Sequence, residues 1–375
     1  MKRTIILLAA LSLLVISCQK EVIKPGPSLG ASFNGAFLVG AALNDAAISG
    51  KDAGANKIVT SQFNTITNEN LLKWEVVHPE PDSFNFEPAD AYVAFGEANG
   101  MVIIGHTLTW HHQTPNWVFE GEDGGLTDRE TLIARMENHI STVVGRYKGR
   151  INGWDVVNEA LNEDGSLRDS KWRQIIGDDY IDLAFKFAQA ADPGAELYYN
   201  DYNMFREAKA LGAVALINHL KAEGLRVDAV GMQGHWGPDF PQINDAENSI
   251  QIFKNAELTV VVTELDINML PRPENMQGAD IELNYENTIK FNPYAEGLPD
   301  SMQTVLTDRY AEFFSLFKKY GDTVDRVTFW GVYDGSSWLD NWPIVGRTNY
   351  PLLFDRQYNP KPAYHAVIKV GEVGK

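Results

Sequence analysis

The sequence is poor in cysteine and in basic residues, and each shortage excludes a class of function. Cys18 is the single cysteine among 375 residues, so the chain can form neither an internal disulfide nor a metal site built from cysteines. Lys and Arg number 32 against 50 Asp and Glu, which gives a formal net charge of −18. A charge of that sign repels polyanions, so nucleic acid is not an expected partner.

Long apolar runs are also missing, except at the start of the chain. Lys2 and Arg3 precede the apolar run 5–16, which is shorter than the roughly 20 residues of a membrane span and is typical of a signal peptide over residues 1–17. The run ends in Val15-Ile16-Ser17-Cys18, which resembles a bacterial lipobox. We therefore expect an exported protein, lipid-anchored through Cys18 at the outer membrane or cell surface. An ordinary signal peptide with an incidental cysteine is the alternative.

Residues 18–35 are expected to hold the anchor and a flexible tether, because Lys24-Pro25-Gly26-Pro27-Ser28 is rich in turn formers. In residues 36–375, short apolar runs alternate with stretches of helical periodicity. This alternation predicts an α/β fold, and eight runs predict a single (β/α)8 TIM barrel of eight parallel strands with outer helices. The runs are 37–43, 61–66, 101–107, 151–157, 196–200, 229–233, 258–263 and 326–330.

Polar and aromatic side chains lie at the end of seven of these runs. The carboxyl ends of parallel barrel strands converge on one mouth, so we expect these side chains to share a site. Stability alone gives no reason to place polar groups there repeatedly. The segments are 67–74, 106–113, 154–159, 200–203, 233–236, 263–266 and 330–338.

Two carboxylates, Glu159 and Glu264, end the fourth and seventh runs. Carboxyl groups about 5 to 5.5 Å apart suit a retaining glycosidase, in which one attacks the anomeric carbon and the other acts as acid and then as base. His235 is expected to hydrogen-bond Glu264, with Asp266 holding the imidazole. Asn158 is a candidate donor to the sugar 2-hydroxyl.

Further candidate sugar ligands lie at the other strand ends. Glu69, Asn70 and Lys73 are expected on one face of a turn, where they can grip hydroxyl groups. Trp330 and Trp338 offer flat faces for pyranose rings, although most aromatic side chains of a chain this size belong to the core.

Five motifs, taken in order, resemble those of the family 10 glycoside hydrolases, which are β-1,4-xylanases. They are Glu69-Asn70…Lys73-Trp74, Gly105-His106-Thr107-Leu108…Trp110-His111…Gln113, Trp154-Asp155-Val156-Val157-Asn158-Glu159, Thr263-Glu264-Leu265-Asp266 and Trp330-Gly331-Val332…Asp334…Ser337-Trp338. The resemblance runs from about residue 37 to about residue 370. It implies retaining hydrolysis of internal bonds in xylan, with Glu159 as acid/base and Glu264 as nucleophile. The sugar ligands expected are Glu69, Asn70, Lys73, His106, Trp110, Gln113, Asn158, Tyr202, Gln233, His235, Trp330 and Trp338.

Two other functions are considered beside the xylanase. One is a β-glucanase of the same barrel clan, and the other is a surface lipoprotein that binds polysaccharide without cleaving it. No cofactor or metal is implied, since none of the 8 histidines has a metal-binding spacing. We see no signal for oligomers and expect a monomer. The proline-rich segment 271–300 is either a wall of the binding groove or an insertion.

Overall fold

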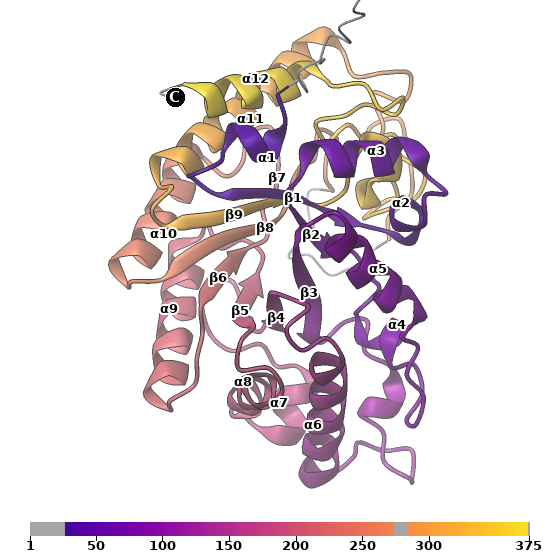
Figure 1. The fold of residues 1–375 in the computed structure, drawn as a ribbon, viewed down its shortest axis with the longest axis vertical. Helices are drawn as coiled ribbons and strands as arrows, with labels where there is room; N and C mark the ends of the chain where they lie inside the picture. Colours follow the sequence, from indigo (N-terminus) through magenta and orange to yellow (C-terminus); the bar gives the residue numbers. More distant parts are fainter. Residues whose placement is uncertain (1–26, 274–283, 374–375) are drawn as a thin grey trace, which may run out of the picture.

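The predicted apolar runs become parallel strands that close on themselves. The computed structural model describes residues 27–273 and 284–373. Within them β1 pairs with both β2 and β9, and β6 pairs with β8, so the strands form a complete ring (Figure 1). The barrel strands are β1 (Leu38–Leu43), β2 (Thr65–Asn68), β3 (Val102–Thr109), β4 (Gly153–Asn158), β5 (Glu196–Asp201), β6 (Ala229–Met232), β8 (Thr259–Ile267) and β9 (Val324–Phe329).

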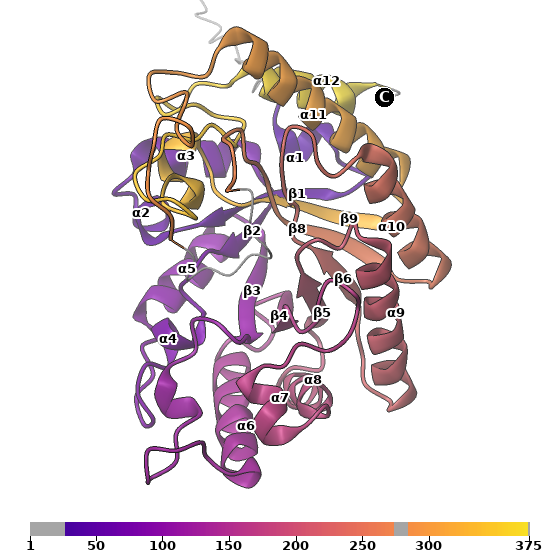
Figure 2. The ribbon, with the colours of Figure 1, turned by 180° about the vertical axis from the view of Figure 1, so that it is seen from behind.

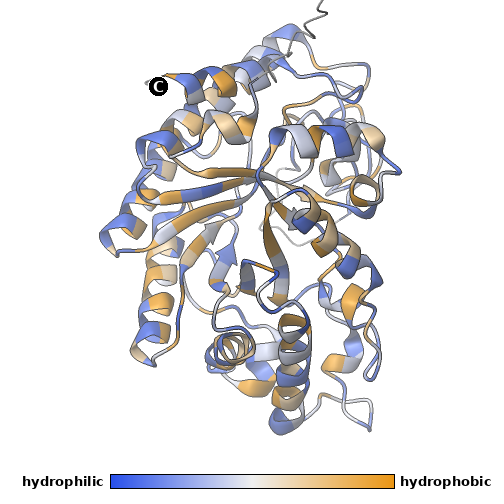
Figure 3. Cartoon of the chain, viewed as in Figure 1, coloured by the Kyte–Doolittle hydropathy of each residue, from blue (hydrophilic) through white to orange (hydrophobic). Residues whose placement is uncertain are grey.

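A long helix follows each barrel strand and covers the outside of the ring, as the two opposite views show (Figures 1 and 2). The helices carry both buried apolar and exposed polar residues, so hydrophobic and hydrophilic colours alternate along them, and the strands are largely hydrophobic with some hydrophilic residues (Figure 3). The helices are α3 (Ala53–Gln62), α5 (Glu87–Ala98), α6 (Arg129–Arg146), α8 (Tyr180–Ala191), α9 (Glu207–Ala222), α10 (Ile243–Asn255), α11 (Asp300–Lys319) and α12 (Pro362–Glu372).

Short elements shape the connections between strands and helices. β7 is a two-residue strand that extends the sheet beside β8 and places His235 opposite Asp266. The short helices are α1 (Leu29–Ser32), α2 (Asp45–Ser49), α4 (Trp74–Val77) and α7 (Lys171–Ile176), and the 3-10 turns are η1 (Asn116–Val118), η2 (Asp334–Ser336) and η3 (Trp338–Asp340). Apart from α1, they lie in loops that follow strands, where barrel enzymes place their sites.

Close packing inside and around the ring depends on a few large side chains. The guanidinium of Arg326 lies 5.0 Å from the ring centroid of Tyr198 within the barrel. Trp154 is fully buried on β4 and lies against Gly105 of β3. A Cβ atom at Gly105 would lie 2.1 Å from the indole, so only glycine allows this contact. Both residues belong to segments that lead directly into the predicted site.

The tether predicted for residues 18–35 ends earlier than residue 35. Leu29 and Phe33 are buried, and α1 packs against α12 at the end of the molecule where the chain ends (Figure 1). The turn-rich composition concealed this because Leu29 and Phe33 provide one short apolar face. The predicted signal peptide and Cys18 lie outside the described residues. No helix in the described ranges has the length and apolarity that a membrane crossing requires.

The run at 61–66 is predicted too early in the chain. Ser61 and Gln62 belong to α3, and β2 begins at Thr65. Asp52 caps α3 by accepting a hydrogen bond from the amide of Ala55, and the helix then continues to Gln62. The remaining strands lie within a few residues of their predicted positions.

Candidate active site

The strand ends open into one cavity of about 610 Å³. It contains both predicted catalytic glutamates and residues from the loops that follow β2, β3, β4, β6, β8 and β9. The lining residues are Glu69, Asn70, Lys73, Glu75, His106, Trp110, Gln113, Asn158, Glu159, Gln233, His235, Glu264, Asn284, Trp330, Trp338, Asn341, Trp342 and Val345. Six of the seven segments predicted to converge therefore line one cavity, and segment 200–203 does not contribute a lining residue.

Glu264 lies within the buried part of β8 and is held by donors on both oxygens. Asn200 Nδ2 donates to Oε1 at 2.8 Å, and His235 Nε2 lies 3.3 Å from Oε2. Burial alone would raise the pKa of Glu264, but the hydrogen bond from His235, the charges of His106 and His235, and the bond from Asn200 outweigh burial and lower it. Glu264 is therefore an ionised carboxylate at neutral pH.

His235 is kept charged by a second carboxylate. Its Nδ1 lies 3.0 Å from Asp266 Oδ2, in the arrangement that the sequence predicted. Burial would lower the pKa of His235, but Asp266 and Glu264 outweigh burial and raise the pKa to about 10. Trp338 Nε1 also donates to Asp266 Oδ2 at 2.8 Å, so the aromatic wall and the charged histidine share one anchor.

Glu159 follows β4, and unlike Glu264 it has no charged donor bound to its carboxyl oxygens within the part of the chain that the structure describes. Trp110 Nε1 donates to Oε2 and Gln233 Nε2 donates to Oε1, each at 2.9 Å. Burial and the charge of Asp201 outweigh these two bonds and raise the pKa of Glu159. The charge of Glu264 acts in the same direction. The pKa of Glu159 is thus shifted upward, in the direction that a general acid requires.

An amide network connects the two glutamates. Asn158 Oδ1 accepts from Asn200 Nδ2 at 3.0 Å and from Gln233 Nε2 at 3.3 Å, and these same amides donate to Glu264 and Glu159. Because its oxygen is used in this way, Asn158 presents its Nδ2 group as a donor to a ligand. Asn200 was not among the predicted site residues, although its position at the end of the fifth run is the same signal that marked the others.

Lys73 is the centre of a second polar group, in the loop after β2. Its Nζ donates to Asn70 Oδ1 at 2.9 Å and to Gln113 Oε1 at 2.7 Å, and it lies 5.0 Å from the Trp110 ring centroid. Burial lowers the pKa of Lys73 although Glu264 and Glu69 oppose this, and burial raises the pKa of Glu69. Lys73, Asn70 and Gln113 thus form a hydrogen-bonded cluster in which Lys73 is buried and Asn70 is half-buried.

Aromatic and histidine rings form the opposite wall. Trp338 stacks on Trp342 with a centroid distance of 4.6 Å, and His235 lies 4.9 Å from Trp338. The His106 ring is held by Asp155 Oδ2, 2.9 Å from its Nδ1, and packs edge-on against Trp330 at 5.2 Å.

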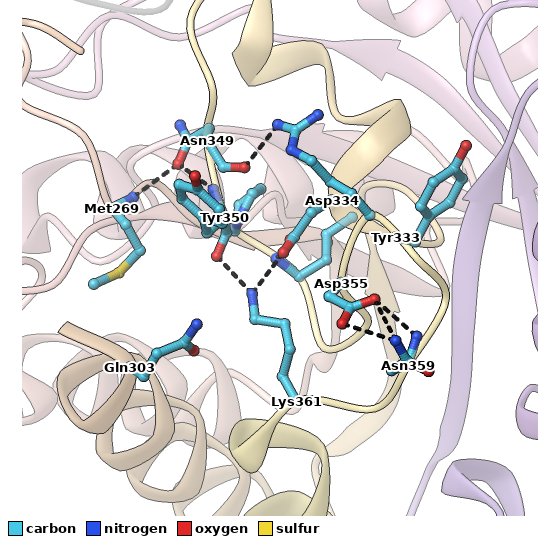
Figure 4. Close-up of polar contacts among 12 residues, drawn as sticks. Met269, Gln303, Tyr333, Asp334, Asn349, Tyr350, Asp355, Asn359 and Lys361 are labelled. Carbon is cyan, nitrogen blue, oxygen red and sulfur yellow. Dashed lines mark hydrogen bonds and ion pairs between the residues drawn. The ribbon is translucent and has the colours of Figure 1, made fainter. Parts of the chain in front are cut away.

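A buried ion pair fixes the start of the loop that follows β9. Lys361 Nζ donates to Asp334 Oδ2 at 2.8 Å and to the carbonyl of Tyr350 at 2.9 Å, and both contacts are visible in Figure 4. Asn349 Oδ1 accepts from the amide of Met269, which joins this loop to the one after β8. These contacts tie the loop that carries Trp338 to α12 and to the loop after β8.

Segment 271–300 contributes to the cavity wall in its described part. Asn284 lines the cavity, and Asn287 Nδ2 donates to the carbonyls of Val345 and Gly346 at 3.3 and 3.1 Å. Thr348 donates its amide proton to a side chain of the same segment, Asn292 Oδ1, at 3.1 Å. Of the two interpretations left open by the sequence, these contacts favour a groove wall.

Tyr202 is the one predicted sugar ligand that is not among the lining residues. Its hydroxyl accepts a hydrogen bond from Arg168 Nη2 at 2.6 Å, and its ring lies 3.7 Å from Lys209 Nζ. Glu75, Asn284, Asn341, Trp342 and Val345 line the cavity but were not predicted. Glu75 follows Lys73-Trp74 directly, whereas Asn284 and Val345 carry no signal in the sequence.

A parallel barrel whose mouth holds two buried carboxyl groups, one with a lowered and one with a raised pKa, beside several tryptophan rings is the arrangement expected of a glycoside hydrolase. No cluster of three or more potential metal ligands occurs among the residues that the structure describes. The sequence model of glycosyl hydrolase family 10 matches residues 28–370. The chain belongs to this family.

Two xylanase sequences and one solved structure match this chain over nearly their whole length. The chain is 49% identical over 336 residues to endo-1,4-beta-xylanase A of Xylanibacter ruminicola, covering 90% of this chain and 91% of the relative. It is 38% identical over 344 residues to endo-1,4-beta-xylanase B of Paenibacillus barcinonensis, covering 91% and 98%. The solved structure of a GH10 endoxylanase from a sugarcane soil metagenome superposes with a TM-score of 0.87 at 41% identity, covering 91% of this chain and 99% of the other.

Proposed function

We propose that the protein is an endo-β-1,4-xylanase that hydrolyses internal β-1,4-xylosidic bonds of xylan with retention of configuration. The observation that carries this proposal is the pair of buried carboxyl groups in one cavity whose pKa values move in opposite directions. Membership of family 10, whose enzymes are retaining hydrolases, and full-length similarity to endo-1,4-beta-xylanases support the substrate.

The first half of the reaction transfers the glycone to Glu264. An oxygen of the Glu264 carboxylate attacks the anomeric carbon while Glu159 donates its proton to the glycosidic oxygen. The bond from the anomeric carbon to that oxygen breaks, and the shortened chain leaves as an alcohol. His235 and Asn200 hold Glu264 ionised before the attack. The product of this step is a glycosyl ester on Glu264, with Glu159 now ionised.

The second half returns the enzyme to its starting state. Glu159 takes a proton from a water molecule whose oxygen attacks the anomeric carbon, and the ester bond to Glu264 breaks. Two inversions give net retention. We assign to Asn158 Nδ2 the donation to the sugar 2-hydroxyl, a bond that strengthens as positive charge develops on the ring.

The decisive measurement follows hydrolysis of plain xylan, glucuronate-decorated xylan and carboxymethylcellulose by reducing-sugar release and product size. We expect turnover on xylan to exceed that on carboxymethylcellulose by far, with oligosaccharides of several lengths appearing early. Preference for carboxymethylcellulose would favour the β-glucanase, and binding without release would favour a non-catalytic polysaccharide-binding protein. The anomeric signals of the first products, followed by NMR, test retention.

We also propose that the enzyme is exported, lipidated on Cys18 and held at the cell envelope as a monomer. The support is the lipobox-like sequence that ends the apolar run 5–16. Labelling with a radioactive fatty acid in the native host tests it. The label and the membrane association should both disappear in Cys18→Ala, and a protein that stays membrane-bound without Cys18 would contradict the anchor. Light scattering on the protein without residues 1–18 tests the monomer.

A further inference from the structure

The segment after Glu159 folds back on that residue. Leu161 and Leu167 form an antiparallel bridge, which returns the chain to the end of β4. The amide of Arg168 then donates to the carbonyl of Ala160 at 2.7 Å, and Arg168 Nε donates to the carbonyl oxygen of Glu159 at 2.8 Å. A charged side chain therefore binds the main chain of the acid/base residue.

The backbone of Glu159 needs such a contact because it is left-handed. Its φ of 60° lies in a region that residues with a Cβ rarely adopt. Its amide donates to the carbonyl of Asn200 on β5 at 2.8 Å, and its carbonyl is bound by Arg168. These two peptide groups flank the Cα atom, so fixing both fixes the direction in which the side chain leaves the backbone.

The hydrogen bonds to the carboxyl oxygens of Glu159 cannot take over the role of the two main-chain hydrogen bonds. Trp110 and Gln233 donate to the two carboxyl oxygens, the same oxygens that must give a proton to the leaving group and take one from water. Those contacts change as the proton moves. The hydrogen bond from Arg168 goes to the main-chain carbonyl of Glu159, which takes no part in proton transfer, so it is available in both halves of the reaction. The charge of Arg168 also acts on the Glu159 carboxyl group.

Arg168 is itself held through a second nitrogen on the same edge of its guanidinium group. Nη2 donates to the hydroxyl of Tyr202 at 2.6 Å, and the Tyr202 amide donates to Asp201 Oδ1 at 2.8 Å. One planar group thus connects Glu159 to the end of β5. Nε and Nη2 donate together in a fixed geometry, which the single ammonium group of a lysine does not reproduce.

We propose that Arg168 is a positioning residue that aims Glu159 at the glycosidic oxygen and at the attacking water, with Tyr202 as its support. The inference rests on the proposed function. It also gives Tyr202 a role behind the acid/base residue in place of the sugar contact expected from the sequence.

Arg168→Met tests the proposal in the full chain with two aryl β-xylobiosides. Phenol is a poor leaving group that needs a proton from Glu159, whereas 2,4-dinitrophenol needs none. We expect kcat/KM to fall about tenfold or more on the phenyl substrate and by less than about twofold on the dinitrophenyl substrate. On the latter, kcat and KM should fall together, because the glycosyl ester accumulates when Glu159 cannot activate water.

Arg173→Met is the matched control. Arg173 also donates to a loop carbonyl, that of Leu167 at 3.1 Å, and pairs with Asp178, but it does not contact Glu159. It should leave the ratio of the two kcat/KM values unchanged. Equal losses on both substrates in Arg168→Met, no loss in that variant, or the same selective loss in Arg173→Met would overturn the proposal.

Milder variants decide the question if Arg168→Met does not fold. Tyr202→Phe removes the supporting hydroxyl, and Arg168→Lys keeps the charge without the two-donor edge. Both should show the selective loss at about two- to fivefold, and loss on neither would refute the role. Failure of the proposed function is distinguishable, because an unaltered enzyme that does not cleave xylan or either xylobioside would show it before any variant is made.

Discussion

Glu159 and Glu264 lie in the same cavity, and both are buried. Burial tends to raise the pKa of both carboxyl groups, yet only the pKa of Glu159 is raised. Glu264 has a charged histidine within 3.3 Å, and its pKa is lowered. Glu159 has two neutral N–H donors and the nearby charge of Asp201, and its pKa is raised. Burial by itself gives every carboxyl group the same tendency, so the neighbouring charge assigns the two roles.

The largest expected effect is the removal of the ionised member of the pair. Glu264→Ala eliminates the nucleophile, and xylan hydrolysis should fall by about 10⁴- to 10⁶-fold. Added azide can occupy the vacated space and attack an activated aryl substrate directly, which should give a glycosyl azide of inverted configuration. Full activity without azide would end the assignment of Glu264.

Removal of Glu159, the carboxyl group with the raised pKa, should have a smaller effect on activity, and the size of that effect should depend on the substrate. Glu159→Ala should lower kcat on xylan by about 10²- to 10⁴-fold, because the leaving sugar needs its proton. On a dinitrophenyl glycoside kcat/KM should change little. Steady-state kinetics on the two substrates checks this, and equal losses on both would contradict the role of Glu159 as the acid.

His235→Gln should bring the pKa of Glu264 closer to that of Glu159. His235 is charged at neutral pH because its pKa is about 10, and that charge stabilises ionised Glu264. Without the charge the pKa of Glu264 rises, so activity should be lost at a higher pH as the solution is acidified. The acid limb of the kcat/KM profile should therefore move toward neutral pH, and kcat should fall by about 10- to 100-fold. An unmoved acid limb would show that His235 does not set the ionisation of Glu264.

The smallest expected effects are shifts of the pH profile on replacing Asn200 or Gln233, the two amides of the network that bind the glutamates. Asn200 donates to Glu264 and Gln233 donates to Glu159, so each bond stabilises the ionised form of one glutamate. Asn200→Ala should move the acid limb of the pH profile upward, and Gln233→Ala should move the basic limb upward, each by about half a pH unit to one pH unit. Movement of the same limb in both variants would mean that the network acts as one unit.

Residues at strand ends were accessible from the sequence, whereas residues that reach the site from distant loops were not. His235 and Asp266 stand in motifs that end apolar runs, and their predicted contact with Glu264 is present. Arg168 is in a loop nine residues beyond Glu159, and its importance depends on the turn that brings it back. Val345 follows Ile344 in the long loop after β9, and nothing in this local sequence marks it as a residue that lines the cavity.

The sequence by itself determined the barrel, the order of its strands and which strand ends carry catalytic side chains, since periodicity and side-chain type are local properties of the chain. The tertiary structure decided which carboxyl group has a raised pKa and which a lowered one, what holds the backbone of Glu159 and where residues 29–33 pack on the fold. These depend on distances of a few ångströms between segments tens to hundreds of residues apart. Electrostatic and hydrogen-bond energies change steeply over such distances, and spacing along the chain does not encode them.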